Sequence, residues 1–272
     1  MALASHACQR TVGLKLEMED FAAKGLLRVG GTAALLAGLL FRRNLGAELT
    51  LLKESGLITV GPTTSPATVS AWFTLLQDSP LIGLTWLNVF DLVNYALVSV
   101  MFLALFATLR RVNRSVMELA AGLGLIGIAV YFASNQALPL LSLSNQYAAA
   151  TTAAQRSMLL ADGQALLTIN QFSSPGRYLS LLLIAVAGLL TSIVMLRSKV
   201  FNRATAYVGM LAAILDLAYC LAVVLLPAVD GELLGVYFIP AAGLCLMIWH
   251  ILIGRRLYQQ GRFAGKTQIQ HS

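Results

Sequence analysis

Two aspartates are the residues whose type and setting could support chemistry in this chain. Asp91 and Asp216 each lie within a long apolar segment, where a charged group costs roughly 2.5–3.5 kcal/mol unless it is paired. At about 1.5 Å per residue, Asp91 is predicted to lie about 13 Å below the outer end of its segment, and Asp216 lies at a similar depth in a segment that runs the other way. Two carboxyls that meet at low dielectric cannot both ionise cheaply, so one of them would carry a proton near neutral pH. Such a pair suits proton coupling or general acid–base work, with interhelical hydrogen bonding as an equal, purely structural alternative.

Further polar side chains accompany the two aspartates at helical spacing. Some share or border the helical face of Asp91, one follows Asp216 by a turn, and others come from a third apolar segment. The predicted ligand or proton candidates are Asp91, Asp216, Asn88, Asn94, Tyr95, Tyr131, Asn135, Gln136 and Tyr219.

Several chemistries are excluded by what the sequence lacks. The three histidines are His6, His250 and His271, and neither they nor the cysteines form a cluster with metal-ligand spacing. The chain also has no phosphate-binding loop, no dinucleotide-binding glycine pattern and no Gly-x-Ser-x-Gly nucleophile turn. We therefore expect no metal and no cofactor, and the sequence identifies no catalytic residue.

Composition places these residues in a membrane protein. Of the 272 residues 58% are hydrophobic and only 11% are charged, and mean hydropathy is +0.76, so charged groups cannot cover a soluble surface. The net charge of +7 does not indicate nucleic acid as a partner, because the cations stand in short groups between apolar runs. The lipid bilayer is the expected partner, and the oligomeric state is left open.

The elements that must position the polar residues are six predicted membrane-spanning helices in an all-α bundle. Their expected bounds are 25–41, 82–108, 116–141, 177–196, 204–227 and 233–254. They form one membrane domain over residues 25–256, between an N-terminal tail of residues 1–24 and a C-terminal tail of residues 257–272.

The distribution of cations predicts the orientation of these spans. With the N-terminus inside, 14 of the 19 Lys and Arg residues fall on the inner side of the membrane, whereas five fall outside. By the positive-inside rule both termini are cytoplasmic, and the expected location is the plasma, or inner, membrane. Glu118, near the inner edge, is expected to pair with Arg114 one turn before it.

Each of the two long outer loops contains a predicted amphipathic helix at the bilayer interface. In the first loop Ser65 is the expected N-cap with Pro66 at the first helical position. The apolar stripe of that helix consists of Val69, Trp72, Phe73 and Leu76. In the second loop Thr152 and Gln155 have capping-box spacing, and Leu159, Leu166 and Ile169 repeat at helical period. We expect both helices to cover the outer mouth of the bundle, rather than to form a separate receptor-like domain.

Three segments resemble a family of bacterial multi-pass membrane proteins that is known only as a domain of unknown function. They are Arg28–Phe41 (RVGGTAALLAGLLF), the stretch Leu81–Arg111 with LNVFDLVNYALVSVMFLALFATLRR, and Ser198–Gly209 (SKVFNRATAYVG). The resemblance covers about residues 25–262 and implies a prokaryotic plasma-membrane helical protein. It assigns no role to any residue.

The leading functional hypothesis is binding or transport of a small molecule or lipid-like solute through an outward-facing polar cavity. Proton coupling by Asp91 and Asp216 would belong to that hypothesis. The alternative is a structural or sensory membrane protein that acts through partner contacts, with the aspartates as interhelical contacts. A membrane-embedded enzyme comes third, because nucleophile, base and metal are not visible as a set.

Overall fold

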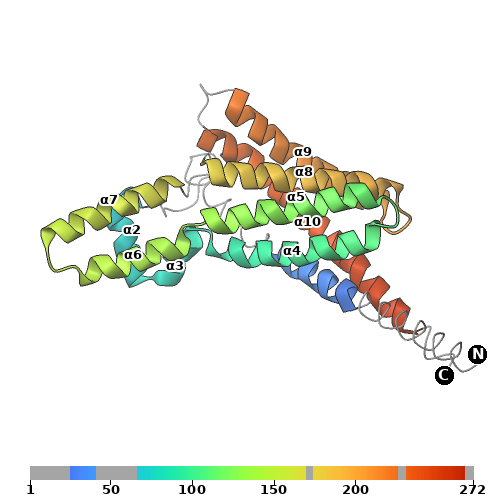
Figure 1. Ribbon diagram of the computed structural model, residues 1–272, viewed down its shortest axis with the longest axis horizontal. Helices are drawn as coiled ribbons and strands as arrows, with labels where there is room; N and C mark the ends of the chain where they lie inside the picture. The colour runs from blue at the N-terminus through green and yellow to red at the C-terminus, as the bar shows by residue number, and fades with distance from the viewer. Residues whose placement is uncertain (1–24, 41–65, 170–173, 226–230, 267–272) are drawn as a thin grey trace, which may run out of the picture.

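The computed structural model describes residues 25–40, 66–169, 174–225 and 231–266, and all regular structure within these ranges is α-helical. The helices form a long bundle and a smaller lobe at one end of it (Figure 1). The bundle contains the first helix Gly25–Leu40, α4 (Val89–Leu109), α5 (Arg114–Ser134), α8 (Pro175–Arg197), α9 (Arg203–Leu225) and α10 (Gly231–Lys266). The lobe contains α2 (Val69–Asp78), α3 (Pro80–Trp86), α6 (Ala137–Ala149) and α7 (Ala153–Ile169). We call the two ends of the bundle the lobe end and the far end.

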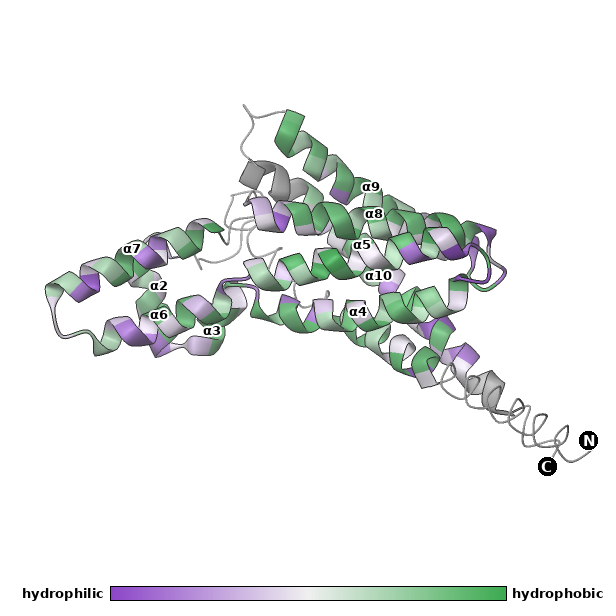
Figure 2. Cartoon of the chain, viewed as in Figure 1, coloured by the Kyte–Doolittle hydropathy of each residue, from purple (hydrophilic) through white to green (hydrophobic). Residues whose placement is uncertain are grey.

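Four helical stretches of the described chain are long and apolar enough to cross a membrane. They are α4, α5 with its continuation α6, α8 and α9. The 21 residues of α4 span about 31 Å, close to the thickness of a hydrocarbon core. Hydrophobic residues cover the bundle helices, whereas hydrophilic ones gather in the far-end turns and in the lobe (Figure 2). This distribution is that of helices embedded in lipid.

Small residues allow the bundle helices to approach one another closely. A side chain at Gly30 would collide with Ala104 of α4, and one at Gly209 with Trp249 of α10. Gly127 of α5 likewise faces the Ser180 backbone of α8. Because lipid tails give helices no hydrophobic reason to associate, close packing of this kind stabilises the bundle.

The lobe has an apolar core separate from that of the bundle. The predicted stripe of α2 is confirmed, since Phe73 and Leu76 are fully buried and Val69 and Trp72 are each 7% exposed. These side chains pack with Leu87, Ala137 and Leu140 and with partly buried residues of α3, α6 and α7. The two outer-loop helices therefore pack against each other and against α6, and their placement at the bilayer interface stays a prediction.

The ends of the lobe helices partly match the prediction. The N-cap of α2 is Thr68, whose hydroxyl accepts a hydrogen bond from the Ala71 N–H at 3.2 Å, whereas Ser65 lies outside the described residues. The predicted capping box of α7 is confirmed. The Gln155 N–H donates to Thr152 Oγ1 at 3.2 Å, and the Thr152 N–H donates to Gln155 Oε1 at 3.3 Å.

The apolar face of α7 differs from the predicted one by a fraction of a turn. Leu160 and Leu166 pack on the lobe core and Gly163 is buried, whereas Ile169 is 44% exposed. A side chain at Gly163 would collide with Val69 and Phe73, so this glycine sets how closely α7 approaches α2. The small residue in the middle of the face, and not a leucine, marks the contact.

Two of the predicted spans are interrupted where the bundle meets the lobe. The expected helix 82–108 consists of α3 and α4, separated at Leu87 and Asn88, and Asn88 adopts a left-handed φ of 59°. The expected helix 116–141 is divided into α5 and α6 at Asn135 and Gln136. Asparagine tolerates the left-handed region better than other non-glycine residues, which explains how an apolar run can break at this point.

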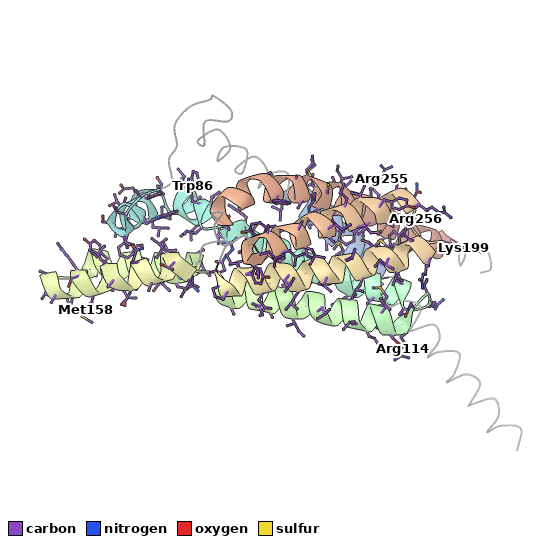
Figure 3. The ribbon with its side chains drawn as sticks, turned by 90° about the horizontal axis from the view of Figure 1, so that it is seen from above. Trp86, Arg114, Met158, Lys199, Arg255 and Arg256 are labelled. Atoms are coloured by element: carbon purple, nitrogen blue, oxygen red, sulfur yellow. The ribbon has the colours of Figure 1, made fainter. Side chains whose placement is uncertain are left out.

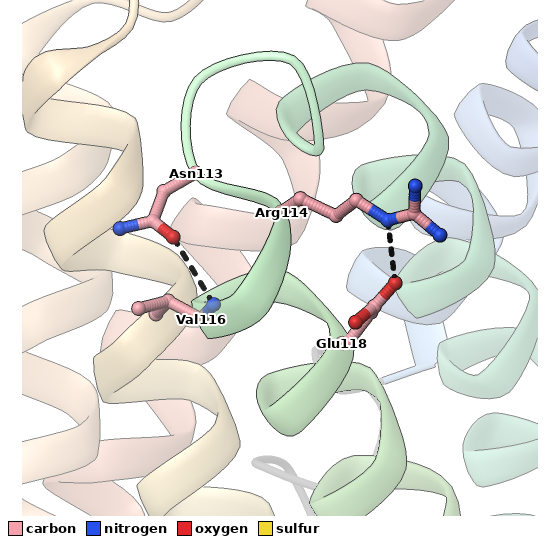
Figure 4. A network of polar contacts seen from close by, with 4 residues as sticks. All are labelled: Asn113, Arg114, Val116 and Glu118. Atoms are coloured by element: carbon pink, nitrogen blue, oxygen red, sulfur yellow. Dashed lines mark hydrogen bonds and ion pairs between the residues drawn. The ribbon is translucent and has the colours of Figure 1, made fainter.

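The far end of the bundle carries short, capped turns. Asn113 Oδ1 accepts a hydrogen bond from the Val116 N–H at 3.2 Å and so caps α5 (Figure 4). The predicted contact of Arg114 with Glu118 is confirmed at 2.7 Å between Nε and Oε1, with both side chains at least half exposed. Beyond this end α10 continues as a helix to Lys266, past the predicted limit of 254.

Candidate functional site

A polar cluster joins three bundle helices at the lobe end. The Tyr131 hydroxyl donates a hydrogen bond to Asp91 Oδ2 at 3.0 Å. The guanidinium carbon of Arg177 lies 5.5 Å from the centroid of the Tyr131 ring, and the Tyr95 ring centroid lies 4.4 Å from it. Tyr131 is 4% exposed and Arg177 is 8% exposed. These four residues, from α4, α5 and α8, are called the lobe-end cluster below.

The ends of the helices bring the cluster together. Asp91 lies in the first turn of α4, where the positive end of the helix dipole favours a carboxylate. Tyr131 lies in the last turn of α5, and Arg177 is the third residue of α8. A cation gains nothing from the N-terminus of a helix, so Arg177 must be stabilised by its neighbours. The face of the Tyr131 ring provides one such contact.

The breaks between bundle and lobe lie directly beside the cluster and use three of the predicted site residues. Asn135 Nδ2 donates to the Asn88 carbonyl at 3.4 Å, and Asn135 Oδ1 accepts from the Ala137 N–H at 3.1 Å. Gln136, 9% exposed, donates to the Ser134 carbonyl. Asn88 precedes α4 in a left-handed conformation, so it does not share a helical face with Asp91 as predicted.

Asn94 lies one turn deeper in α4 than Asp91. The side chain is 1% exposed, and neither Nδ2 nor Oδ1 has a hydrogen-bond partner within the described part of the chain. A buried amide without partners costs free energy in an apolar medium, so Asn94 can accept and donate further hydrogen bonds at this position.

Asp216 and Tyr219 lie apart from this cluster, on α9. Asp216 is 6% exposed and Tyr219 is 1% exposed, and the carboxyl acts electrostatically on the thiols of Cys220 and of Cys245 in α10. Nine residues separate Asp216 from the lobe end of α9, about 13 Å, whereas Asp91 is only about 3 Å from the start of α4. The break at Asn88 therefore removes the equal depth on which a shared proton was based.

The sequence prediction missed Arg177. It assigned this arginine to the outer loop as one of five cations on the side that the positive-inside rule disfavours. That position is itself the signal, because an arginine on the disfavoured side next to a span calls for a specific partner. Among the described residues no group of three or more His, Cys, Asp or Glu could hold a metal ion.

The long apolar helices of the bundle define the class of this protein, which is a helical membrane protein. Residues 67–254 match the family described as Domain of unknown function (DUF4386), so the chain belongs to that family. The matched range contains the lobe and the lobe-end cluster, whereas the first helix Gly25–Leu40 lies before it. The predicted family is thus confirmed over a shorter range than the expected residues 25–262. No curated protein and no solved structure matches the chain.

Proposed function

We propose that the chain crosses a bacterial plasma membrane six times, with both termini in the cytoplasm. In this arrangement the first helix and α10 join the four clearly apolar stretches, and residues 25–256 form one membrane unit between two tails. Supporting this, a side chain at Gly31 would collide with the backbone of Tyr258 in α10, so one face of the first helix packs closely against α10. Arg28 Nε also donates to the Gly261 carbonyl at 3.0 Å. The lobe then lies on the outer side of the membrane.

The function that the geometry supports best is binding of a small polar or lipid-like solute at the lobe-end cluster. The observation that carries this proposal is the contact of Arg177 with Tyr131 and of Tyr131 with Asp91 at the lobe end, which is the outer end in the proposed orientation. The cluster offers a cation, an anion and aromatic faces within one site. A solute with a charged head and an apolar body would match both the cluster and the lipid-facing helices around it.

Transport would extend this proposal along the bundle. Asp91, Asn94 and Asp216 lie about 3, 8 and 13 Å from the lobe ends of α4 and α9, so these two helices carry polar side chains at increasing depth. In a proton-coupled mechanism the carboxyls of Asp91 and Asp216 would each bind and release a proton in turn. The remaining site candidates lie in these two regions: Asn88, Asn135 and Gln136 at the lobe-end breaks, and Tyr219 on α9 one turn from Asp216.

A ligand screen on the full-length protein in detergent tests solute binding. Glutamate, arginine, oleate and lysophosphatidylethanolamine serve as probes, and the thermal unfolding midpoint is the readout. We expect at least one probe to raise the midpoint of the native protein, and Asp91→Asn and Arg177→Gln to abolish that rise. Arg156→Gln on the lobe removes the same charge as Arg177→Gln and should keep the response. Absence of any rise, or an equal rise in all variants, would contradict the proposal.

Flux then separates binding from transport. The protein is reconstituted in liposomes that contain a pH-sensitive dye, and the stabilising probe is added outside. Acidification or alkalinisation of the lumen that requires Asp216 supports proton-coupled transport. Binding without flux would indicate that the protein acts as a receptor.

A second candidate function is contact with a partner through the lobe. A hollow of about 370 Å³ opens between α6 and α7, and Gln146, Gln155, Met158 and Asp162 are among the residues that line it. Met158 is 68% exposed beside this hollow, and its flexible, polarizable side chain can adapt to the surface of a partner. Figure 3 shows Met158 on α7, well away from the bundle. If Met158→Ser abolished a sensory response of the cell and left solute binding intact, contact with a partner through the lobe would be favoured.

A further inference from the structure

Exposed cations collect on one side of the far end, where α10 passes the turn between α8 and α9. Lys199, Arg203, Arg255 and Arg256 are all exposed, and they are called the basic edge below. Arg256 Nε donates to the Val200 carbonyl at 2.6 Å, which brings α10 and the turn together. Figure 3 shows Lys199, Arg255 and Arg256 together at this end of the bundle.

Nothing in the surrounding sequence neutralises the basic edge. No Asp or Glu occurs in residues 195–209 or 243–266, which contain the four cations. The second cationic group at the same end, on the turn between α4 and α5, is different. There Arg114 pairs with Glu118, and the Arg110 guanidinium carbon lies 5.9 Å from the centroid of the Phe106 ring. The basic edge is therefore a group of four cations that no carboxylate of the described residues neutralises.

The geometry of Arg256 suits a phosphate group. Its described hydrogen bond uses Nε alone, so the guanidinium is held in place while its two Nη groups face no described acceptor. A guanidinium fixed in this way presents paired donors to two phosphate oxygens.

The depth of the basic edge indicates where that phosphate comes from. Lys199 and Arg203 flank the turn between the apolar helices α8 and α9, and Arg255 and Arg256 directly follow the apolar stretch 233–254. All four cations thus lie at the level where a hydrocarbon core gives way to lipid headgroups.

We propose that the basic edge binds the headgroup of an anionic phospholipid, with Arg256 on the phosphodiester and Lys199, Arg203 and Arg255 around it. This site lies at the opposite end of the bundle from the lobe-end cluster and does not depend on solute binding there. Lys and Arg residues next to a membrane span attract anionic lipids, and basic pockets between membrane helices bind their headgroups.

A lipid titration of the full-length protein in detergent tests this site. Dioctanoyl phosphatidylglycerol, dioctanoyl phosphatidylcholine and inorganic phosphate are added separately, and the thermal unfolding midpoint is followed. We expect phosphatidylglycerol alone to raise the midpoint of the native protein. In Lys199→Gln/Arg255→Gln about 30-fold more phosphatidylglycerol should be needed for the same rise. Arg256→Lys, which keeps the charge but loses the paired donors, should show a smaller loss.

The matched control is Arg110→Gln/Arg111→Gln, which removes two charges from the other turn at the same end. It should respond to phosphatidylglycerol as the native protein does. An equal loss in this control would mean diffuse attraction instead of a site and would overturn the proposal. The proposal also fails if phosphatidylcholine or inorganic phosphate raises the midpoint as much as phosphatidylglycerol does.

Discussion

Arg177 has the most demanding setting of any residue in the lobe-end cluster. It is 8% exposed in the first turn of an apolar helix, where both burial and the helix dipole oppose a positive charge. Its stability as a cation depends on the π face of Tyr131, and Tyr131 in turn holds Asp91 through its hydroxyl. The tyrosine is the centre of the cluster, because it touches both charged residues.

The contribution of the Tyr131 hydroxyl can be measured directly. Tyr131→Phe keeps the ring under Arg177 but removes the donor to Asp91, so we expect a loss of about 1.5–3 kcal/mol in the free energy of unfolding. Chemical unfolding in mixed detergent micelles gives this value. Tyr147→Phe on the lobe is the control, because the Tyr147 ring packs on Phe73 at 5.2 Å and no described hydrogen bond uses its hydroxyl. Equal losses in the two variants would show that the hydroxyl of Tyr131 has no special role.

Asn94 offers a second test at the scale of one residue. Asn94→Leu replaces an amide that lacks described partners with an apolar side chain of similar shape, so the free protein should gain about 1–3 kcal/mol in stability. The same variant should no longer be stabilised by a probe that binds the native protein. Asn135→Leu is the control and should destabilise, because the Asn135 amide is hydrogen-bonded to Asn88 and Ala137. A destabilised Asn94→Leu would show that water or protein already satisfies the amide.

Small residues set the distance between neighbouring helices, and the two kinds of glycine in the bundle can be compared. Gly209→Ala would place a methyl group against Trp249 Nε1 and Ser192 Oγ, so we expect a loss of about 1–3 kcal/mol. Gly122→Ala in α5 meets nothing within 4 Å and should gain about 0.5–1 kcal/mol through helix propensity. Unfolding of both variants in the same detergent checks the pair. A stabilised Gly209→Ala would mean that α9 and α10 are further apart than described.

Local signals predicted the elements well where one short stretch decides the structure. The capping box of Thr152 and Gln155 and the buried stripe from Val69 to Leu76 depend only on near neighbours in sequence. The break at Asn88 has no such signal, since apolar residues continue on both sides and hydropathy cannot distinguish one helix from two. Its cause is tertiary, because the Asn88 carbonyl accepts a hydrogen bond from Asn135, 47 residues further on.

The candidate site was predictable in part for the same reason. Asp91, Tyr95 and Tyr131 stand out from sequence because polar groups in apolar helices are costly, and the structure brings these three together. Which helix each aspartate contacts depends on where the helices begin. Because α4 begins at Val89 and not at residue 82, Asp91 lies near the helix end and not at the depth of Asp216. Arg177 was not predicted as a site residue, because a cation at the end of a span is usually interpreted as a topology signal.

At the scale of the whole molecule, the lobe and the basic edge lie at opposite ends of the bundle (Figure 3). The proposed orientation places the lobe outside, which labelling of intact cells can test. A membrane-impermeant maleimide should react with a cysteine introduced at Ser157, an exposed residue of α7. Ser115→Cys, exposed at the far end beside Arg114, should react only after the membrane is permeabilised. The opposite pattern would invert the molecule and place the basic edge at the outer leaflet.

The separate core of the lobe has a consequence for biosynthesis. Its two halves are distant in the chain, because α2 and α3 precede α4 whereas α6 and α7 follow α5. The apolar side chains of Trp72 and Phe73 therefore leave the ribosome before their partners from α6 and α7 exist. Until α4 and α5 have been inserted as a hairpin, only the membrane surface or a chaperone can shield that stripe. In the proposed orientation this exposure ends when the second half of the lobe has been translocated and packs on the first.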